Sequence, residues 1–415
     1  MALRPAPKRT AHDNVPRREE VRYLLTVLEA AQKISSTSDL ETLLDKIVNE
    51  IAPVFGCMQC FVWLCEDASG DLVLAGAPPA KGYTKGTRLR IGREGLVGHV
   101  AATGRMRYTP DVRRDPLYVD ASRRFDTRSE LDLPLICNNR VIGVLNTESK
   151  YVDGFDVRQR SALKRLADYT ATAVENARAS TRDQAEKQEA RELQMRLLPK
   201  GPLVAGSFEL QGRCVPSGVV GGDWFDYFAI GSDRVAVALA DVAGKGLAAA
   251  LLMSSSRMLL RACMAQTSRP SEVLKMMNRF LVDDLPPARF VTLVFGVLDL
   301  RTGEFMFANA GHPEPLLISD SQTFLRTQRG LPLGMRESEY DDYSVTLTPG
   351  SRLLFYSDGI WEASNSAEDE FGAAHLLEAS AQEWATPDSL LESVFAFTGC
   401  RALKDDATAV MLRAA

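Results

Sequence analysis

The chain has 415 residues, of which 45% are hydrophobic, so it can bury a core in each of two or three domains, and a disordered chain is excluded. Its 49 Lys and Arg against 54 Asp and Glu give a net charge of -5, which provides no basic field for general nucleic-acid binding. No stretch approaches ~18 consecutive apolar residues and the first residues lack a signal-peptide core, so we expect a cytoplasmic protein with no nucleic-acid or membrane partner.

The first half of the chain predicts a small α+β domain. Residues 1–20 are rich in Pro and Arg and predict a disordered tail. Apolar residues recur at helical spacing from Val21 and again in LETLLDKIVNEIAPVF, where residues 36–39 are capping candidates. The runs CMQCFVWLCED, DLVLAGA, ELDLPLI and RVIGVLNTES predict strands. Helices beside an antiparallel sheet favour the α+β class.

One long helix is expected over residues 155–198, which contain neither Gly nor Pro. Its apolar stripe fades over residues 178–192, where no apolar side chain is larger than Ala. A parallel homodimeric coiled coil, which we favour, competes with a solvated connector. At its end, Leu193, Leu197 and Leu198 are expected to pack against the next domain.

Residues 199–415 predict a second, larger domain. The runs RVAVALADV, FVTLVFGVLDL, EFMFANAG and SRLLFYSDG predict strands, and residues 299–304 predict a hairpin turn. Two helices are expected, in GLAAALLMSSSRMLLRACMAQ and from Pro270 through Val282.

Aspartates in this second domain stand beside strand ends and glycines. Asp241 ends an apolar strand before VAGKG, and Asp358 ends another before Gly-Ile. Any one Asp-Gly pair alone is an ordinary turn former. Carboxylates crowded at one end of a sheet would repel each other without a cation, which predicts Mg²⁺ or Mn²⁺ and favours phosphoester hydrolysis. The aspartates in this pattern are Asp223, Asp226, Asp241, Asp358, Asp405 and Asp406.

Six blocks carry a resemblance: GGDWFDY, ADVAGKGLAAALLMS, RFVTLVFGVLDLRTGEFMFANAGHPEP, LPLG, SRLLFYSDGIWEASN and DDAT. Over residues 193–412 they resemble the SpoIIE-like, sigma-regulatory branch of the PPM serine/threonine phosphatases. The resemblance implies an αββα sandwich and a metal-bound water as the nucleophile. No phosphate-binding Arg is assigned. The ligands that it implies for two Mn²⁺ or Mg²⁺ ions are Asp223, Asp241, the backbone carbonyl of Val242, Asp358 and Asp405.

Two other residues in these blocks can each be interpreted in two ways. His312 in Asn-Ala-Gly-His-Pro either supports the metal ligands or transfers a proton, or is a turn residue bonded to backbone. Lys245 in Gly-Lys-Gly either meets phosphate or, as we favour, is a solvated loop residue.

Competing motifs are weaker. GGDWFDY is similar to the GGDEF signature of diguanylate cyclases, but Trp224 replaces the Glu that the cyclase needs. Cys263 and Arg269 have the spacing of a cysteine phosphatase, yet Cys263 lies near the end of a helix, where the helix dipole raises a thiol pKa. The cysteines of GCMQCFVWLCED are expected to be buried thiols.

Residues 21–177 resemble the GAF sensor family, through GLVGHVAATGR, YTPDV, TRSELDLPL, RVIGVLNTES and LADYTATAVENA. The resemblance implies either a small-molecule pocket or a ligand-free dimerisation module. The signature of the cyclic-nucleotide-binding subset is absent, because Asn146 is followed by Thr147.

Together the patterns predict a signal-regulated, metal-dependent protein phosphatase. By resemblance, its substrate is a phosphoserine protein, an anti-anti-sigma factor. The alternative is a non-catalytic scaffold that regulates partners by interaction, against which the retention of all four metal-binding aspartates argues.

Overall fold

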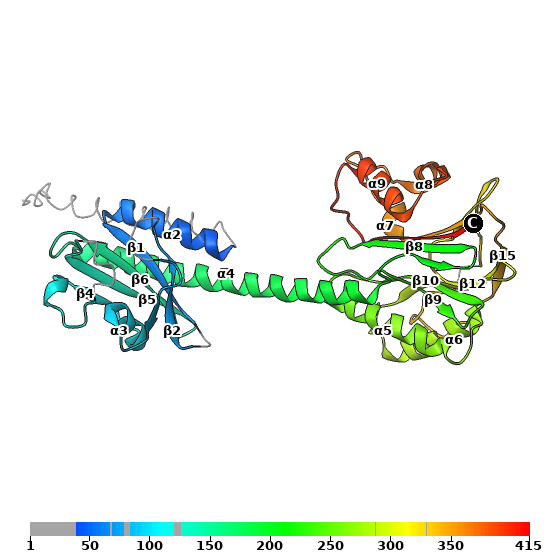
Figure 1. Ribbon diagram of the computed structural model, residues 1–415. Coiled ribbons are helices and arrows are strands. Elements are labelled where there is room, and N and C mark those ends of the chain that lie inside the picture. The colour runs from blue at the N-terminus through cyan, green and yellow to red at the C-terminus, as the bar shows by residue number, and fades with distance from the viewer. Residues whose placement is uncertain (1–38, 67–68, 79–83, 120–125, 287, 329) are drawn as a thin grey trace, which may run out of the picture. The chain divides into compact units, whose positions relative to one another are not determined.

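The computed structural model describes residues 39–66, 69–78, 84–119, 126–286, 288–328 and 330–415. They form two compact units, divided between Ala185 and Glu186 and drawn in Figure 1. The expected tail and the helix expected from Val21 lie outside the described residues.

The N-terminal unit is a six-stranded antiparallel sheet in the order β3-β2-β1-β6-β5-β4. On β1 the side chains alternate, so that Val62 packs with α2 and α4 on one face while Trp63 packs with α3 on the other. Its elements are α2 (Leu40–Phe55), β1 (Gln59–Cys65), β2 (Asp71–Gly76), β3 (Arg88–Arg90), α3 (Gly95–Thr103), β4 (Arg107–Thr109), a 3-10 turn (Val112–Arg114), β5 (Ser129–Cys137), β6 (Arg140–Ser149) and α4 (Val157–Leu197).

Local chemistry fixes the ends of α2. The Asp39 carboxylate accepts a 2.8 Å hydrogen bond from the Thr42 backbone N–H, so the capping role expected of residues 36–39 falls on Asp39. Gly56 ends the helix at φ 67°, in the left-handed region that glycine tolerates.

Helix α4 buries its stripe only over its first half. Leu163, Leu166 and Val174 are fully buried, whereas residues 181–189 are exposed. The fading of the apolar stripe therefore corresponds to a middle part of the helix that is exposed within the single chain.

The C-terminal unit has two antiparallel sheets, in the orders β15-β12-β11-β10-β9 and β14-β13-β16-β17-β8-β7. Helices α5 and α6 cover the first sheet and α8 and α9 the second, as Figure 1 shows. The expected αββα sandwich is confirmed. Its elements are β7 (Leu203–Ala205), β8 (Phe208–Val215), β9 (Trp224–Ile230), β10 (Arg234–Val242), α5 (Leu247–Met264), α6 (Pro270–Asp284), β11 (Val291–Asp299), β12 (Glu304–Ala310), β13 (Leu316–Ile318), β14 (Gln322–Phe324), β15 (Tyr343–Thr346), β16 (Arg352–Tyr356), α7 (Asp358–Trp361), α8 (Gly372–Ala381), α9 (Pro387–Thr398) and β17 (Ala407–Ala414).

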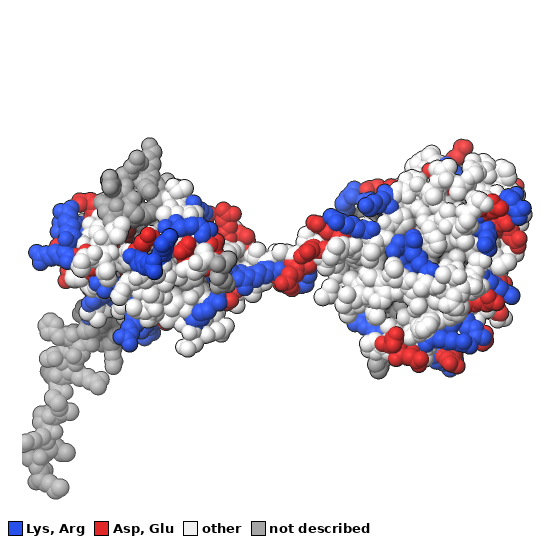
Figure 2. Space-filling model, turned by 60° about the horizontal axis from the view of Figure 1, so that its bottom comes forward, with Lys and Arg blue, Asp and Glu red and all other residues white. Residues whose placement is uncertain are grey.

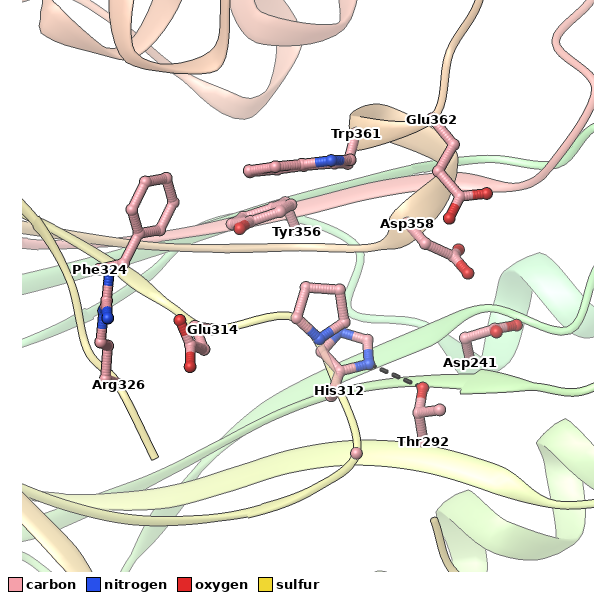
Figure 3. Close-up of a pocket in the computed structure, with 12 residues that line it drawn as sticks. Asp241, Thr292, His312, Glu314, Phe324, Arg326, Tyr356, Asp358, Trp361 and Glu362 are labelled. Carbon is pink, nitrogen blue, oxygen red and sulfur yellow. Dashed lines mark hydrogen bonds between the residues drawn. The ribbon is translucent and has the colours of Figure 1, made fainter. Parts of the chain in front are cut away.

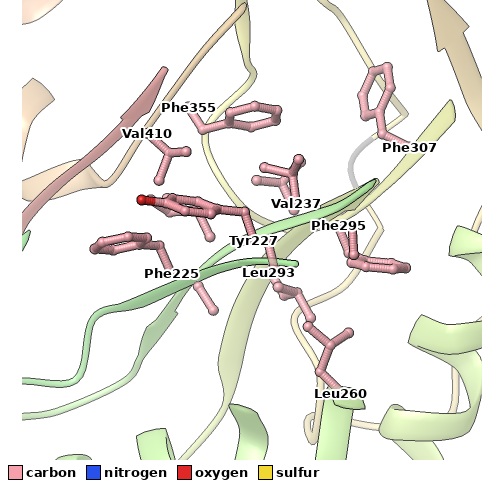
Figure 4. Close-up of a cluster of buried hydrophobic side chains, with 14 of the residues drawn as sticks. Phe225, Tyr227, Val237, Leu260, Leu293, Phe295, Phe307, Phe355 and Val410 are labelled. Atoms are coloured by element: carbon pink, nitrogen blue, oxygen red, sulfur yellow. The ribbon is translucent and has the colours of Figure 1, made fainter. Parts of the chain in front are cut away.

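The main core lies between the two sheets (Figure 4). Phe225 and Tyr227 of β9 pack with Phe355 of β16 and Val410 of β17, while Leu260 of α5 packs in the same cluster from the helical side of the first sheet. Because β10 is covered on both faces, its sequence is an apolar run rather than an alternation. This packing holds the strand ends, and therefore Asp241, in fixed positions.

Helix α5 is long and apolar enough to cross a membrane by length and composition alone, a test that the core helices of globular domains also pass. Its inner face packs on the sheet, and Arg257 on that face is ion-paired with buried Asp226. On the face shown in Figure 2, acidic and basic side chains are interspersed over both units.

Candidate active site

A cavity of about 610 Å³ lies where β10 and β11 of one sheet and β16 of the other come to their ends (Figure 3). Figure 3 shows Asp241, Asp358 and Glu362 at one end of it, and Phe324 and Arg326 with Glu314 at the other. The residues that line it are Asp241, Thr292, Gly311, His312, Pro313, Glu314, Phe324, Arg326, Tyr356, Asp358, Trp361 and Glu362.

Two of the sequence-predicted ligands, Asp241 and Asp358, face this cavity. Asp241 stands next to the end of β10, opposite Thr292 of β11, and burial together with the Asp358 and Asp405 carboxylates raises its pKa to about 7. Asp358 begins α7 directly after β16, and burial, then Asp405 and Glu362, raise its pKa. Each carboxylate therefore resists the ionisation of its neighbours.

Asp223 is a buried carboxylate just before β9. Neither of its two oxygens has a hydrogen-bond partner among the described residues. Burial, then Asp241 and Asp406, raise its pKa well above the usual range. The hydroxyls of Ser357 and Thr408 are near enough to oppose this effect, but they make no hydrogen bond of normal geometry with it. A buried carboxylate without donors is costly unless a proton or a cation offsets its charge.

Asp405 and Asp406 are adjacent but have different surroundings. Asp406 is buried, and it accepts hydrogen bonds from the backbone N–H groups of Ser217 at 2.7 Å and Gly222 at 2.6 Å. Asp405 is half exposed, and its carboxylate lies 3.1 Å from the ammonium of Lys245. Asp406 thus holds the loop before Asp223, which leaves Asp405 as the member of the pair that can bind a cation.

The two glycines before Asp223 are required by close packing. A Cβ on Gly221 would lie 2.3 Å from an oxygen of Asp406, and a Cβ on Gly222 would lie 2.7 Å from the Val242 carbonyl oxygen. The Gly-Gly-Asp sequence therefore brings the loop against both Asp406 and the Val242 carbonyl.

Asp226 is not part of this group. It is fully buried on the other side of β9, where Arg261 donates two hydrogen bonds to it, at 2.8 and 2.9 Å, and Arg257 lies 3.0 Å away. These two arginines offset the charge of the Asp226 carboxylate. It therefore anchors α5 to the sheet.

His312 is buried beside the cavity. Its Nδ1 lies 2.9 Å from the Thr292 hydroxyl, and its backbone N–H and carbonyl both bond to the Asn309 side chain. Burial lowers its pKa to about 3, so the ring is neutral near pH 7. Its Nε2 is buried and has no partner among the described residues. The backbone of His312 is therefore part of a hydrogen-bonded turn, as one of the two interpretations expected. Its ring nevertheless lies in the lining of the same cavity as Asp241 and Asp358.

Lys245 is a largely exposed loop residue whose ammonium also donates to the Lys404 carbonyl. Cys263 is buried on α5, and burial raises its thiol pKa, the opposite of what a cysteine nucleophile needs. Of the three cysteines expected to be buried thiols, Cys60 is fully buried and its thiol pKa is raised, whereas Cys57 and Cys65 are only partly buried.

As the side chains stand, no three acidic, histidine or cysteine groups in the described part of the chain converge on one point as a complete metal site. The donor set nonetheless fits a hard divalent cation, since it consists of carboxylates with raised pKa values, and both oxygens of Asp223 are orphaned.

The end of α4 contacts the loop that carries Asp223. The Gln194 side chain donates to the Gly221 carbonyl at 2.6 Å and accepts from the Gly221 N–H at 3.1 Å, while Arg191 donates to the Val219 carbonyl. Leu198 is buried as expected, but Leu193 is 58% exposed. The expected packing of Leu193 is therefore wrong, because the adjacent Gln194 occupies the inward position.

The sequence interpretation also missed the aromatic end of the cavity, formed by Phe324, Tyr356 and Trp361, together with Arg326. Trp361 was within a recognised block, three residues after Asp358. Phe324 and Arg326 belong to no motif, so the sequence held no signal for them.

Comparison with known families matches both units. The family model for Stage II sporulation protein E (SpoIIE) matches residues 231–415, and the GAF domain model matches residues 39–174. Most of the C-terminal unit is therefore similar to the SpoIIE family, and most of the N-terminal unit to the GAF domain family. Of the candidate ligands, Asp223 precedes the matched range.

Relatives and solved structures agree with this assignment. The chain is 28% identical to the phosphoserine phosphatase RsbU of Bacillus subtilis over 48% of this chain and 61% of that protein. It is 29% identical to the phosphoserine phosphatase RsbP of the same organism, over 43% of this chain and 45% of that one. It spans about half the length of the curated relatives it matches. The SiaA-PP2C domain of Pseudomonas aeruginosa, at 19% identity, matches with a TM-score of 0.50 over 57% of this chain and 98% of that one, a likeness of fold.

Proposed function

We propose that this protein is a metal-dependent protein serine/threonine phosphatase regulated through its GAF domain. The observation that carries the proposal is the buried Asp223, whose two oxygens have no donor among the described residues, beside Asp241 with its raised pKa. The SpoIIE-type domain and its similarity to two proteins named phosphoserine phosphatases support the same activity.

The residues that would hold the metal are Asp223, Asp241 with the Val242 carbonyl, Asp358 and Asp405, and we propose two Mn²⁺ or Mg²⁺ ions. When bound, such ions offset the carboxylate charge and make a water nucleophilic enough to attack phosphorus at neutral pH. The donor types support this choice, since carboxylate and carbonyl oxygens suit hard divalent cations.

The surrounding residues would keep these ligands in position. Asp406 fixes the loop that carries Asp223 through two backbone N–H groups. Thr292 orients the neutral His312 ring, which can donate or accept one hydrogen bond at the cavity wall without adding charge. We propose this supporting role for His312.

The proposed substrate is a phosphoserine protein, and the SpoIIE-like resemblance favours an anti-anti-sigma factor. We further propose that the protein is a cytoplasmic homodimer joined along α4. A change in the packing of this helix, or the binding of a small molecule by the GAF domain, would alter the position of the Asp223 loop through Gln194. The contact of Gln194 with Gly221 supports this route.

The test is hydrolysis by the purified full-length chain. With Mn²⁺ or Mg²⁺ it should release phosphate from p-nitrophenyl phosphate and from a phosphoserine peptide, and a chelator should remove both activities. Full activity after exhaustive chelation would contradict the proposed mechanism. An absence of hydrolysis under every metal condition would favour the non-catalytic scaffold instead.

A further inference from the structure

The cavity extends well beyond the carboxylates. In Figure 3, Asp241 and Asp358 lie at one end, and Phe324 and Arg326 lie at the other. At about 610 Å³, the cavity falls within the size range of sites that enclose whole ligands, of roughly 300–1,000 Å³. A phosphate group held at the carboxylate end would leave the aromatic end for the rest of the substrate.

Three aromatic rings form a shelf at this end. Trp361 stacks on Tyr356 with centroids 6.1 Å apart and an interplanar angle of 14°, and Phe324 meets Trp361 edge-on at 6.0 Å. Tyr356 is buried, while Phe324 and Trp361 are partly exposed to the cavity. Partly exposed aromatic rings in a hollow favour contact with an apolar side chain of a ligand.

The shelf is fixed relative to the carboxylates by the chain itself. Tyr356 ends β16 two residues before Asp358, and Trp361 ends α7, the helix that Asp358 begins. A group that rests on the shelf is therefore held at a constant distance from Asp358, as a substrate-positioning surface requires.

Arg326 adds a positive charge beside the shelf. Among the described residues that line the cavity it is the one cation, against Asp241, Asp358, Glu314 and Glu362. It is exposed, and within the described part of the chain no ion pair or hydrogen bond of its side chain is found, although Figure 3 shows the Glu314 carboxylate at the same end of the cavity. A guanidinium without an ion pair at this end of the cavity is suited to bind a carboxylate of the incoming ligand.

We infer that this aromatic and cationic end is the subsite that selects the polypeptide segment flanking the phosphoserine. The shelf takes an apolar side chain of that segment, and Arg326 takes an acidic one. The inference rests on the proposed phosphatase function and adds the class of sequence that the enzyme prefers.

The experiment compares two kinds of substrate on the full-length chain with Mn²⁺. The first kind is p-nitrophenyl phosphate, which has no flanking sequence. The second kind is a set of phosphoserine peptides in which one position at a time, within four residues of the phosphoserine, is Glu, Lys, Leu or Ala. The wild-type chain should have a lower KM for the peptides with Glu or Leu at the favoured positions.

The variant Arg326→Glu should raise the KM for the Glu-containing peptides about tenfold relative to the change with p-nitrophenyl phosphate, and should shift the preference toward Lys. Arg336→Glu, which reverses an exposed charge outside the cavity, is the matched control and should leave both substrates as in the wild type. This reversal of preference is a readout that a merely structural role would not produce.

Trp361→Ala should remove the preference for Leu, with Trp384→Ala, at a 68% exposed tryptophan outside the cavity, as its control. If Trp361→Ala fails to fold, Phe324→Ala tests the same shelf from the edge strand β14.

The possible results are distinct. A wild-type chain that hydrolyses p-nitrophenyl phosphate but shows no flanking preference would overturn this inference and leave the phosphatase proposal standing. Equal losses on both substrate types in Arg326→Glu and Trp361→Ala would also overturn it, because these residues would then support the reaction itself. A wild-type chain that hydrolyses neither substrate would overturn both proposals.

Discussion

Each unit of this protein buries a group of carboxylates, but the two groups differ in the hydrogen-bond donors that surround them. In the GAF domain, Glu130, Asp132 and Glu148 lie on the paired strands β5 and β6 and are almost fully buried. One side chain, Asn146, donates to Glu130 at 2.7 Å and to Asp132 at 2.8 Å, and Thr127 donates to Glu148 at 2.8 Å.

In the C-terminal unit, the Ser357 hydroxyl and two loop amides near Asp223 donate to other acceptors. The Ser357 hydroxyl donates to the Asp406 carbonyl, and the Ser217 and Gly222 N–H groups donate to the Asp406 carboxylate, so Asp223 receives none of them. In the GAF group each carboxylate thus accepts at least one hydrogen bond, although one oxygen of Asp132 has no donor. Both oxygens of Asp223 lack a donor, so a proton or a bound cation must offset its charge. The donors around buried acids, more than the acids themselves, separate a structural group from a cation site.

The largest effect expected from this difference is on catalysis. Asp241→Asn or Asp358→Asn should lower turnover of p-nitrophenyl phosphate at least about a hundredfold, because each removes a charged ligand from the proposed metal site. The matched change Asp132→Asn in the GAF group, and Cys263→Ser on α5, should keep basal turnover within about twofold. Steady-state kinetics measures the turnover, and thermal unfolding checks that each variant folds. Loss of activity in Cys263→Ser with retention in the Asp variants would instead favour a cysteine nucleophile.

A second effect concerns helix α4, which connects the two units that carry these carboxylate groups. Two residues inserted near Gln184 would rotate the first half of α4 by ~200° relative to Gln194, while seven residues amount to nearly two full turns. If α4 transmits the state of the GAF domain, the short insertion should change basal or ligand-dependent activity by about fivefold or more, and the long one should be tolerated. Activity assays and sedimentation analysis measure both. Unchanged activity and regulation in both variants would make α4 a simple tether.

A smaller effect is expected on the stability of the GAF domain. Burial raises the pKa of Asp132 to about 7, so the folded state keeps a proton between the ordinary value of 3.8 and about 7 that the unfolded chain has lost. Stability therefore falls as the pH rises through this window. Asp132→Asn should weaken this fall, and at pH 8 its GAF transition should lie at least roughly 2–4 °C above that of the wild type. Calorimetry of the full-length chain from pH 4.5 to 8 measures this, and parallel curves for the two proteins would contradict it.

The smallest effect is expected at His312. Because burial lowers its pKa to about 3, the ring does not titrate between pH 6 and 9. His312→Gln should lower kcat by about tenfold or less while the shape of the pH–rate profile over this range stays the same. If the variant removed an inflection near pH 6.5, His312 would carry a proton in the reaction.

The sequence allowed Asp241 and Asp358 to be predicted as strand-end residues because an apolar run, an aspartate and a glycine follow one another locally. The local pattern alone did not separate Asp226 from Asp223, which share the GGDWFDY segment, and only the family resemblance assigned Asp223 as the ligand. The distinction comes from tertiary contacts, because Arg257 and Arg261 of α5 neutralise Asp226 whereas no described side chain donates to Asp223.

The end of α4 shows the same limit. Hydrophobicity favoured Leu193 as a contact, yet the inward position belongs to Gln194, which bonds to a backbone group that only the folded loop presents. The aromatic shelf likewise needs the edge strand β14 beside α7, and these elements are more than thirty residues apart in the chain.

The most direct test of the contrast between the two carboxylate groups is calorimetric titration of the full-length chain with Mn²⁺ at pH 7. We expect the wild type to bind up to two ions per chain. Asp241→Asn should lose at least one of them, while Asp132→Asn should bind as the wild type does. No binding to the wild type, or binding that survives Asp241→Asn and is lost in Asp132→Asn, would contradict the assignment of the cation site to the C-terminal unit.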